Sequence, residues 1–168
     1  GACEQGSMPV RLAGANIFDS LWVTSSGMQT CCNSSGGPAV WADALAALKA
    51  AKATGRSGIR VFRFFASLFG SPGKMWRQNS TLYWKEFDKL MNAIEELGLY
   101  CIPSIGTGGM WSQQANALLV GLNETANDVV LNSSSVSRQL QDEYFRQIVK
   151  RYKDRSSVLF WELGNELN

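Results

Sequence analysis

The sequence of 168 residues contains no histidine, and this absence narrows its chemistry more than any other. Without an imidazole the chain cannot build a histidine-based catalytic triad, and most catalytic zinc sites are excluded as well. A glycine-rich run begins at Gly106, but it lacks the Lys-Ser/Thr pair of a phosphate-binding loop. We therefore expect a site that uses no metal ion and no cofactor.

Long apolar runs and an excess of charge of one sign are also missing. No apolar run approaches the roughly 18–20 residues of a membrane span. Lys and Arg total 16 against 14 Asp and Glu, and the two signs alternate along the chain. Because nucleic acids and anionic membranes are bound by concentrated basic faces, we expect neither as a partner.

The residues that are present fit one ordinary domain with a buried core. Hydrophobic residues make up 45% of the chain and charged residues 18%, which excludes a disordered chain. With histidine missing, carboxylates, asparagines, arginines and aromatic side chains are left to carry any chemistry.

Asn-x-Ser/Thr sequons are more frequent than chance predicts for this composition. They begin at Asn33, Asn79, Asn123 and Asn132. Acceptor asparagines of this kind lie on exposed loops of secreted glycoproteins, so we expect a secreted, extracellular protein.

The four cysteines allow three disulfide pairings, and the sequence does not rank them. They are Cys3, Cys31, Cys32 and Cys101. Neighbouring cysteines can hardly bond to each other, so one of the adjacent pair is expected to bridge elsewhere. Cys101 lies in an apolar run, where a core position is an alternative.

Apolar periodicity and glycine stops predict strands and helices in strict alternation. The expected strands are residues 10–16, 58–65, 99–105 and 157–163, and the expected helices are residues 39–54, 83–97 and 137–154. This order predicts an α/β fold with parallel strands and right-handed crossovers.

Long loops follow the carboxyl ends of the first three strands, where α/β folds place their sites. They span residues 17–38, 66–82 and 106–136. Each of them carries one tryptophan that could stack on the apolar face of a sugar ring, namely Trp22, Trp76 and Trp111. The other three tryptophans fit core positions in helices or strands, namely Trp41, Trp84 and Trp161.

The run Trp161-Glu-Leu-Gly-Asn-Glu166 ends the fourth expected strand with a carboxylate. A carboxyl group at a strand end, in a cleft lined by aromatic side chains, suits a proton donor because burial raises its pKa. The alternative is a carboxylate that caps a helix or is solvated.

This run resembles the Asn-Glu motif of clan A glycoside hydrolases, especially family 5, the cellulases and β-mannanases. The resemblance implies that Glu166 is the general acid/base and that Asn165 hydrogen-bonds the sugar 2-hydroxyl. It also implies that Arg63 keeps active-site carboxylates ionised, and Asn16 matches the family pattern as well. From the residues alone, Arg63 could equally form an ion pair with Glu162 inside the fold.

The resemblance covers residues 1–168 as the N-terminal half, strands one to four, of a (β/α)8 TIM barrel. A whole barrel typically needs about 250 residues, so the resemblance implies a fragment that lacks the nucleophile. Retaining hydrolysis requires two carboxyl groups roughly 5–5.5 Å apart. Glu162 lies about 13 Å from Glu166 along an extended strand, which is too far for the second carboxylate. Asp19 is then the other carboxylate near a strand end.

We therefore expect a retaining β-glycoside hydrolase, of endo-β-mannanase or cellulase type, that acts on plant-type polysaccharides. Two alternatives remain open. One is a carbohydrate-binding half barrel without catalysis, and the other is a flavodoxin-like small-ligand module, against which the missing phosphate loop argues. An open half barrel also predicts self-association through exposed apolar strand edges.

Overall fold

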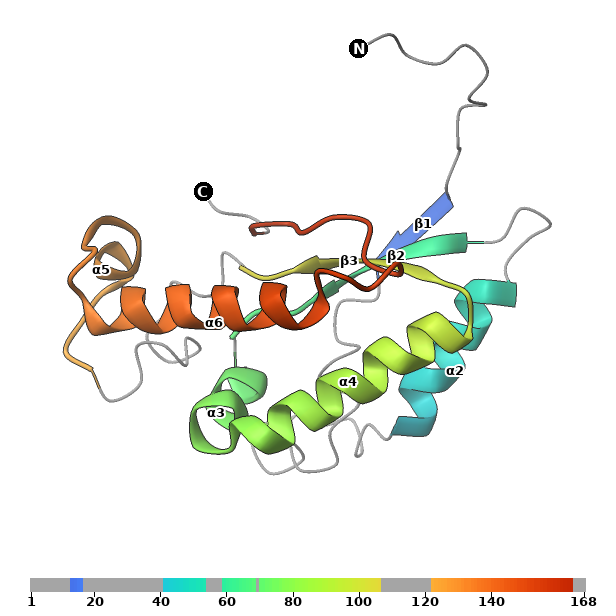
Figure 1. Ribbon diagram of the computed structural model, residues 1–168, viewed down its shortest axis with the longest axis horizontal. Helices are drawn as coiled ribbons and strands as arrows, with labels where there is room; N and C mark the ends of the chain where they lie inside the picture. The colour runs from blue at the N-terminus through green and yellow to red at the C-terminus, as the bar shows by residue number, and fades with distance from the viewer. Residues whose placement is uncertain (1–12, 17–40, 54–58, 69, 107–121, 165–168) are drawn as a thin grey trace, which may run out of the picture.

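The computed structural model describes residues 13–16, 41–53, 59–68, 70–106 and 122–164, which form one open sheet and five helices (Figure 1). The parallel strands are β1 (Ala13–Asn16), β2 (Ile59–Phe65) and β3 (Tyr100–Ser104), in the order β1-β2-β3. The helices are α2 (Trp41–Ala53), α3 (Gly70–Gln78), α4 (Ser80–Glu96), α5 (Ala126–Leu131) and α6 (Val136–Tyr152).

The predicted half of a (β/α)8 barrel is wrong. The described residues form a small α/β fold whose sheet has three strands and stays open. Residues 157–163, the expected fourth strand, meet β3 through two isolated parallel bridges, Cys101 with Val158 and Ser104 with Glu162. We call residues 157–164 the outer segment.

Pro103 explains why the outer segment is not a strand. Its pairing with β3 begins regularly, because the Cys101 N–H donates to Ser157 at 2.7 Å and the Cys101 carbonyl accepts from Leu159 at 3.0 Å. The next donor in the ladder would be residue 103, but proline has no N–H. The ladder is therefore interrupted after Leu159.

Pairing resumes one residue later than a regular ladder allows. The Pro103 carbonyl accepts from Glu162 at 3.1 Å rather than from Trp161, and Ile105 donates to the Glu162 carbonyl at 2.9 Å. The extra residue makes a β-bulge, which re-aims the side chains that follow it. Val158 and Trp161 consequently both pack against the core, although strict alternation would separate them.

Aromatic side chains fill the space between one face of the sheet and helices α4 and α6. The cluster includes the buried rings of Phe62, Phe64, Tyr83, Phe87, Tyr144 and Tyr152. Burying each large apolar side chain contributes about 1.5–3 kcal/mol, so this cluster is the main attachment of the helices. The tryptophans predicted as core are half-buried and pack against this cluster, namely Trp41, Trp84 and Trp161.

Two buried tyrosines connect the helices to the end of β2. The Tyr144 hydroxyl donates to the carbonyl of Ala66, and the Tyr83 hydroxyl, 2.7 Å from that of Tyr144, donates to it in turn. Burial raises the pKa of both tyrosines well above the ordinary value. Both hydroxyls therefore stay protonated and remain donors.

Periodicity predicted most elements correctly. Helices α2, α4 and α6 and strands β1, β2 and β3 all lie where the sequence predicts them. Helices α3 and α5, in contrast, lie inside segments predicted as long loops. Helix α5 opens with a capping box in which Thr125 and Asp128 bond to each other, a signal that the sequence contained.

Cys101 occupies the core position that the sequence left open as an alternative to a disulfide. Cys101 is a buried free thiol, and burial raises its pKa to about 12. The other three cysteines lie outside the described residues.

The outer segment carries exposed apolar side chains: Leu159, Phe160 and Leu163 are 39%, 57% and 70% exposed. Self-association through such side chains stays a prediction.

An ion pair on the solvent side of the core joins α4 to α6. Both Arg151 and the Tyr152 hydroxyl donate to the Asp88 carboxylate, with Arg151 Nε and Tyr152 Oη each 2.9 Å from Oδ1. Partial burial raises the pKa of Asp88, but the hydrogen bonds from Arg151 and Tyr152 outweigh it and hold this pKa below its usual value. The Asp88 carboxylate therefore stabilises the folded state when it is ionised.

We predict that Asp88→Asn lowers the free energy of unfolding by about 0.5–1.5 kcal/mol at pH 7, because one charge-assisted contact becomes neutral. The wild-type advantage is present above the unfolded pKa of about 3.9 and is lost as the pH falls through the lower folded pKa. Urea denaturation at pH 7 and in steps down to pH 2.5 measures it. An equal difference between the two proteins at every pH would contradict this assignment.

Candidate functional site

The candidate site lies at the carboxyl ends of the parallel strands. The structure describes two of the six predicted site residues, Arg63 and Trp76. The other four lie outside the described residues, namely Trp22, Trp111, Asn165 and Glu166. Asp19, considered as a second carboxylate, lies outside them too.

Strand register brings Asn16, Arg63 and Glu162 toward one edge of the sheet. Asn16, the exposed last residue of β1, lies opposite Arg63 of β2. Ser104, the last residue of β3, forms the bridge with Glu162. Because all these strands are parallel, their carboxyl ends meet at the same edge, as the sequence order predicts.

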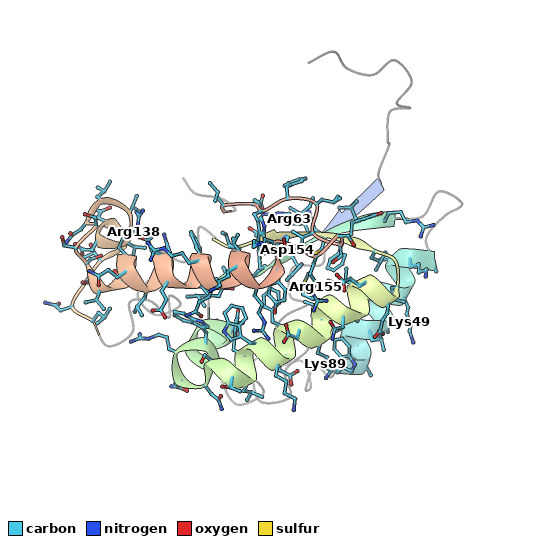
Figure 2. All side chains as sticks on the ribbon, viewed as in Figure 1. Lys49, Arg63, Lys89, Arg138, Asp154 and Arg155 are labelled. Atoms are coloured by element: carbon cyan, nitrogen blue, oxygen red, sulfur yellow. The ribbon has the colours of Figure 1, made fainter. Side chains whose placement is uncertain are left out.

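Arg63, labelled in Figure 2, forms an ion pair with Glu162, in which Nε donates to Oε2. The side chains are 15% and 31% exposed, so the pair is partly shielded from water. Of the two readings that the sequence left open for Arg63, the internal ion pair with Glu162 is the one observed. Pairing of this kind is required because a half-buried charge without a partner is costly.

The bulge in the outer segment determines that this pair can form. Arg63 alternates with Phe62 and Phe64, which enter the core, and therefore lies on the opposite face of β2. With the bulge, Trp161 packs on the core side and Glu162 turns to the face that carries Arg63. The ion pair thus holds the stretch of chain that leads into Asn165 and Glu166.

Gly106, two residues after the end of β3, allows the outer segment to approach closely. A Cβ atom at this position would lie inside the contact distance of the Leu163 carbonyl oxygen. Ser104 supports the same turn, because its buried hydroxyl donates to the Gly106 carbonyl at 3.2 Å. Neither role was predicted, although a glycine directly after a strand is a recognisable signal of close backbone approach.

Trp76 is not the exposed loop tryptophan that the sequence predicts. It belongs to α3, is 6% exposed, and its Nε1 donates to Gln147 at 3.1 Å. Its ring packs edge-to-face on Tyr144 with centroids 5.4 Å apart. Stacking on a sugar needs an open ring face, so we remove Trp76 from the sugar-binding set.

Two hollows in the described surface lie away from this edge. One of about 680 Å³ opens between α2, α4 and α6 and is lined in part by Trp41, Asp88 and Arg151. Another of about 530 Å³ lies at the amino end of β3, beside Tyr100 and Arg155. Neither contains a predicted site residue. A third hollow, of about 260 Å³, is lined in part by Trp76 and Gln147.

Neither a group of metal-ligating side chains nor a helix fit to cross a membrane occurs in the described residues. Within these ranges, no three side chains of the His, Cys, Asp or Glu types are grouped so that they could hold a metal ion. None of the described helices is both long enough and apolar enough to cross a membrane.

We predict that Gly106→Ala displaces the outer segment and lowers the free energy of unfolding by about 1–3 kcal/mol, because the added methyl group collides with backbone atoms. Urea denaturation gives the stability, and the fluorescence of Trp161 reports the displacement. Gly14→Ala in β1 is the matched control, since its Cβ would lie 3.5 Å from the Val61 carbonyl oxygen, an ordinary contact. Equal stability losses in the two variants would refute the close approach.

Comparison with known proteins leaves the family open. No protein-family model matches this chain, and no curated protein sequence matches it. The resemblance to glycoside hydrolases therefore rests on the run Trp161–Glu166 and on Asn16 and Arg63.

Proposed function

We propose that this chain acts on β-linked polysaccharides such as mannan or cellulose, as a glycoside hydrolase in which Glu166 is the general acid/base. Asn165 binds the sugar 2-hydroxyl, and Trp22 and Trp111 stack on sugar rings. The observation that supports this proposal is the ion pair of Arg63 with Glu162, which holds the chain directly before Asn165 at the carboxyl edge of the sheet.

Cleavage of a glycosidic bond needs a proton on the leaving oxygen, so the acid must be protonated at the working pH. A neighbouring arginine usually lowers the pKa of a carboxyl group and would work against this. Because the Glu162 carboxylate neutralises Arg63, the arginine can support the edge of the sheet without keeping Glu166 ionised. In this proposal Arg63 is a positioning residue, which differs from the role that the family resemblance implies.

The nucleophile is a separate question. A retaining mechanism needs a second carboxylate roughly 5–5.5 Å from the first. Glu162 is engaged by Arg63, and none of the carboxylates in the described residues offers a free group on a strand end at this edge. We therefore propose that the chain supplies the acid/base and the sugar-binding surface, while a carboxylate elsewhere supplies the nucleophile.

The second candidate is a carbohydrate-binding protein without catalysis. The engagement of Glu162 by Arg63 favours it, because the described edge then presents no nucleophile. Both candidates require sugar binding, and only the first requires the Glu166 proton.

We predict that azide replaces the nucleophile. Azide attacks C1 of the sugar, the bond from C1 to the glycosidic oxygen breaks, and Glu166 gives its proton to the departing oxygen. The product from mannan or cellulose oligosaccharides is a glycosyl azide, which mass spectrometry detects. Glu166→Gln should abolish the product because a carboxamide cannot donate that proton, a loss of about 10²-fold or more.

The matched control is Glu96→Gln, the same substitution on the exposed surface of α4. It should leave the product yield unchanged. Oligosaccharide binding, measured by calorimetry, separates the two candidates: binding without azide product favours the binding protein. If mannan and cellulose oligosaccharides do not bind at all, both candidates fail.

A further inference from the structure

The turn between α5 and α6 presents an asparagine of the sequon type to solvent. Asn132 is exposed and follows α5 directly, and Ser135 begins the next helix as its N-cap. The Asn132 carbonyl accepts from the Ser135 N–H at 3.0 Å, which closes the turn. The run Asn132-Ser133-Ser134 meets the Asn-x-Ser/Thr requirement.

The side chain of Asn132 uses both of its polar atoms in the turn. Oδ1 accepts a hydrogen bond from the Ser134 backbone N–H at 3.1 Å. Nδ2 donates a hydrogen bond to the Asp128 side chain and keeps a second hydrogen, which a glycan can replace. Nδ2 is the atom to which a glycan is attached, so the turn can remain intact with a glycan in place.

Apolar side chains surround this asparagine. Val130 and Leu131 at the end of α5 are 47% and 79% exposed, and Val136 at the start of α6 is 48% exposed. Arg138 holds the end of α5 in place, because its Nη1 donates to the Val130 carbonyl at 3.0 Å (Figure 2). Neighbouring exposed apolar side chains mark a surface that another molecule or group can contact.

The turn itself is held firmly at both ends. The Glu124 carboxylate accepts from the N–H groups of Val136 and Ser137, each at 2.8 Å, and so caps α6. The Ser135 hydroxyl donates to the Asp128 carbonyl at 2.9 Å. The position of Asn132 relative to its apolar neighbours is therefore well defined.

From these observations we infer that Asn132 is an N-glycosylation site and that its glycan covers the apolar patch of Val130, Leu131 and Val136. The donor is a lipid-pyrophosphate-linked oligosaccharide of the secretory pathway. Nδ2 forms a bond to C1 of the oligosaccharide and loses one proton, while the bond from C1 to the pyrophosphate oxygen breaks and the lipid pyrophosphate leaves. The inference is independent of Glu166 and requires entry into the secretory pathway.

Asn79 and Asn123 are exposed sequon asparagines as well. Asn79 caps α4 through Oδ1, which accepts from the Leu82 N–H at 3.0 Å. Among the exposed large apolar side chains of the described residues, those nearest in sequence to a sequon are Val130, Leu131 and Val136, beside Asn132. Of the sequon asparagines in the described residues, Asn132 is the one directly next to such a side chain, Leu131.

The experiment expresses the full chain behind a secretion leader in a eukaryotic host. Peptide mass mapping after enzymatic removal of the glycan in ¹⁸O water identifies the modified asparagines. Ser134→Ala removes the sequon but keeps the backbone N–H that binds Asn132 Oδ1. Ser133→Ala is the matched control, because the middle position of the sequon tolerates alanine.

We predict a glycan on Asn132 in the wild type and in Ser133→Ala, and its loss in Ser134→Ala. The loss should raise the fluorescence of the apolar dye ANS, and adding Leu131→Ser should reverse that rise. If Ser134→Ala does not fold, removing the glycan from the folded wild-type protein gives the same readout. An unmodified Asn132 in secreted wild-type protein, or unchanged dye binding after glycan loss, would overturn the inference.

Discussion

The architecture depends on one chain of hydrogen bonds through the core. The Tyr83 hydroxyl donates to Tyr144, Tyr144 donates to the carbonyl of Ala66, and the Ala66 N–H donates to the Ser104 carbonyl at 2.8 Å. These contacts join α4, α6, the end of β2 and the end of β3. Burial keeps both tyrosines protonated, so the chain of donors persists over the ordinary pH range. The carboxyl edge of the sheet, where the candidate site lies, is therefore anchored to two helices.

A second constraint acts on the outer segment. Pro103 withholds one N–H from the ladder, and the neighbouring chain responds with a bulge rather than a fourth strand. The bulge turns Glu162 toward Arg63 and leaves Trp161 on the core. A single missing hydrogen bond thus turns an expected strand into a bulged segment, and Arg63, expected as an active-site contact, pairs with Glu162.

Sequence patterns predicted the local elements well, because periodicity reports which face of a helix or strand is buried. Helix α3 escaped prediction, since Gly70, Pro72 and Gly73 are poor helix formers and its stability comes from the burial of Trp76. The half barrel was wrong for a similar reason. Alternation of strands and helices predicts parallel pairing, but it does not report whether a neighbouring strand lacks the donor that continued pairing needs.

The sequence by itself determined the chemistry available to this protein: no imidazole, a carboxylate that follows an asparagine after a predicted strand, and four sequons. It also determined the helices and strands that local periodicity specifies. Only the tertiary structure decided that Arg63 pairs with Glu162, 99 residues away, that Trp76 is buried, and that Asn132 lies among exposed apolar side chains. The reason is physical, because these outcomes depend on the register and packing of segments that are distant in the sequence, and no local pattern encodes them.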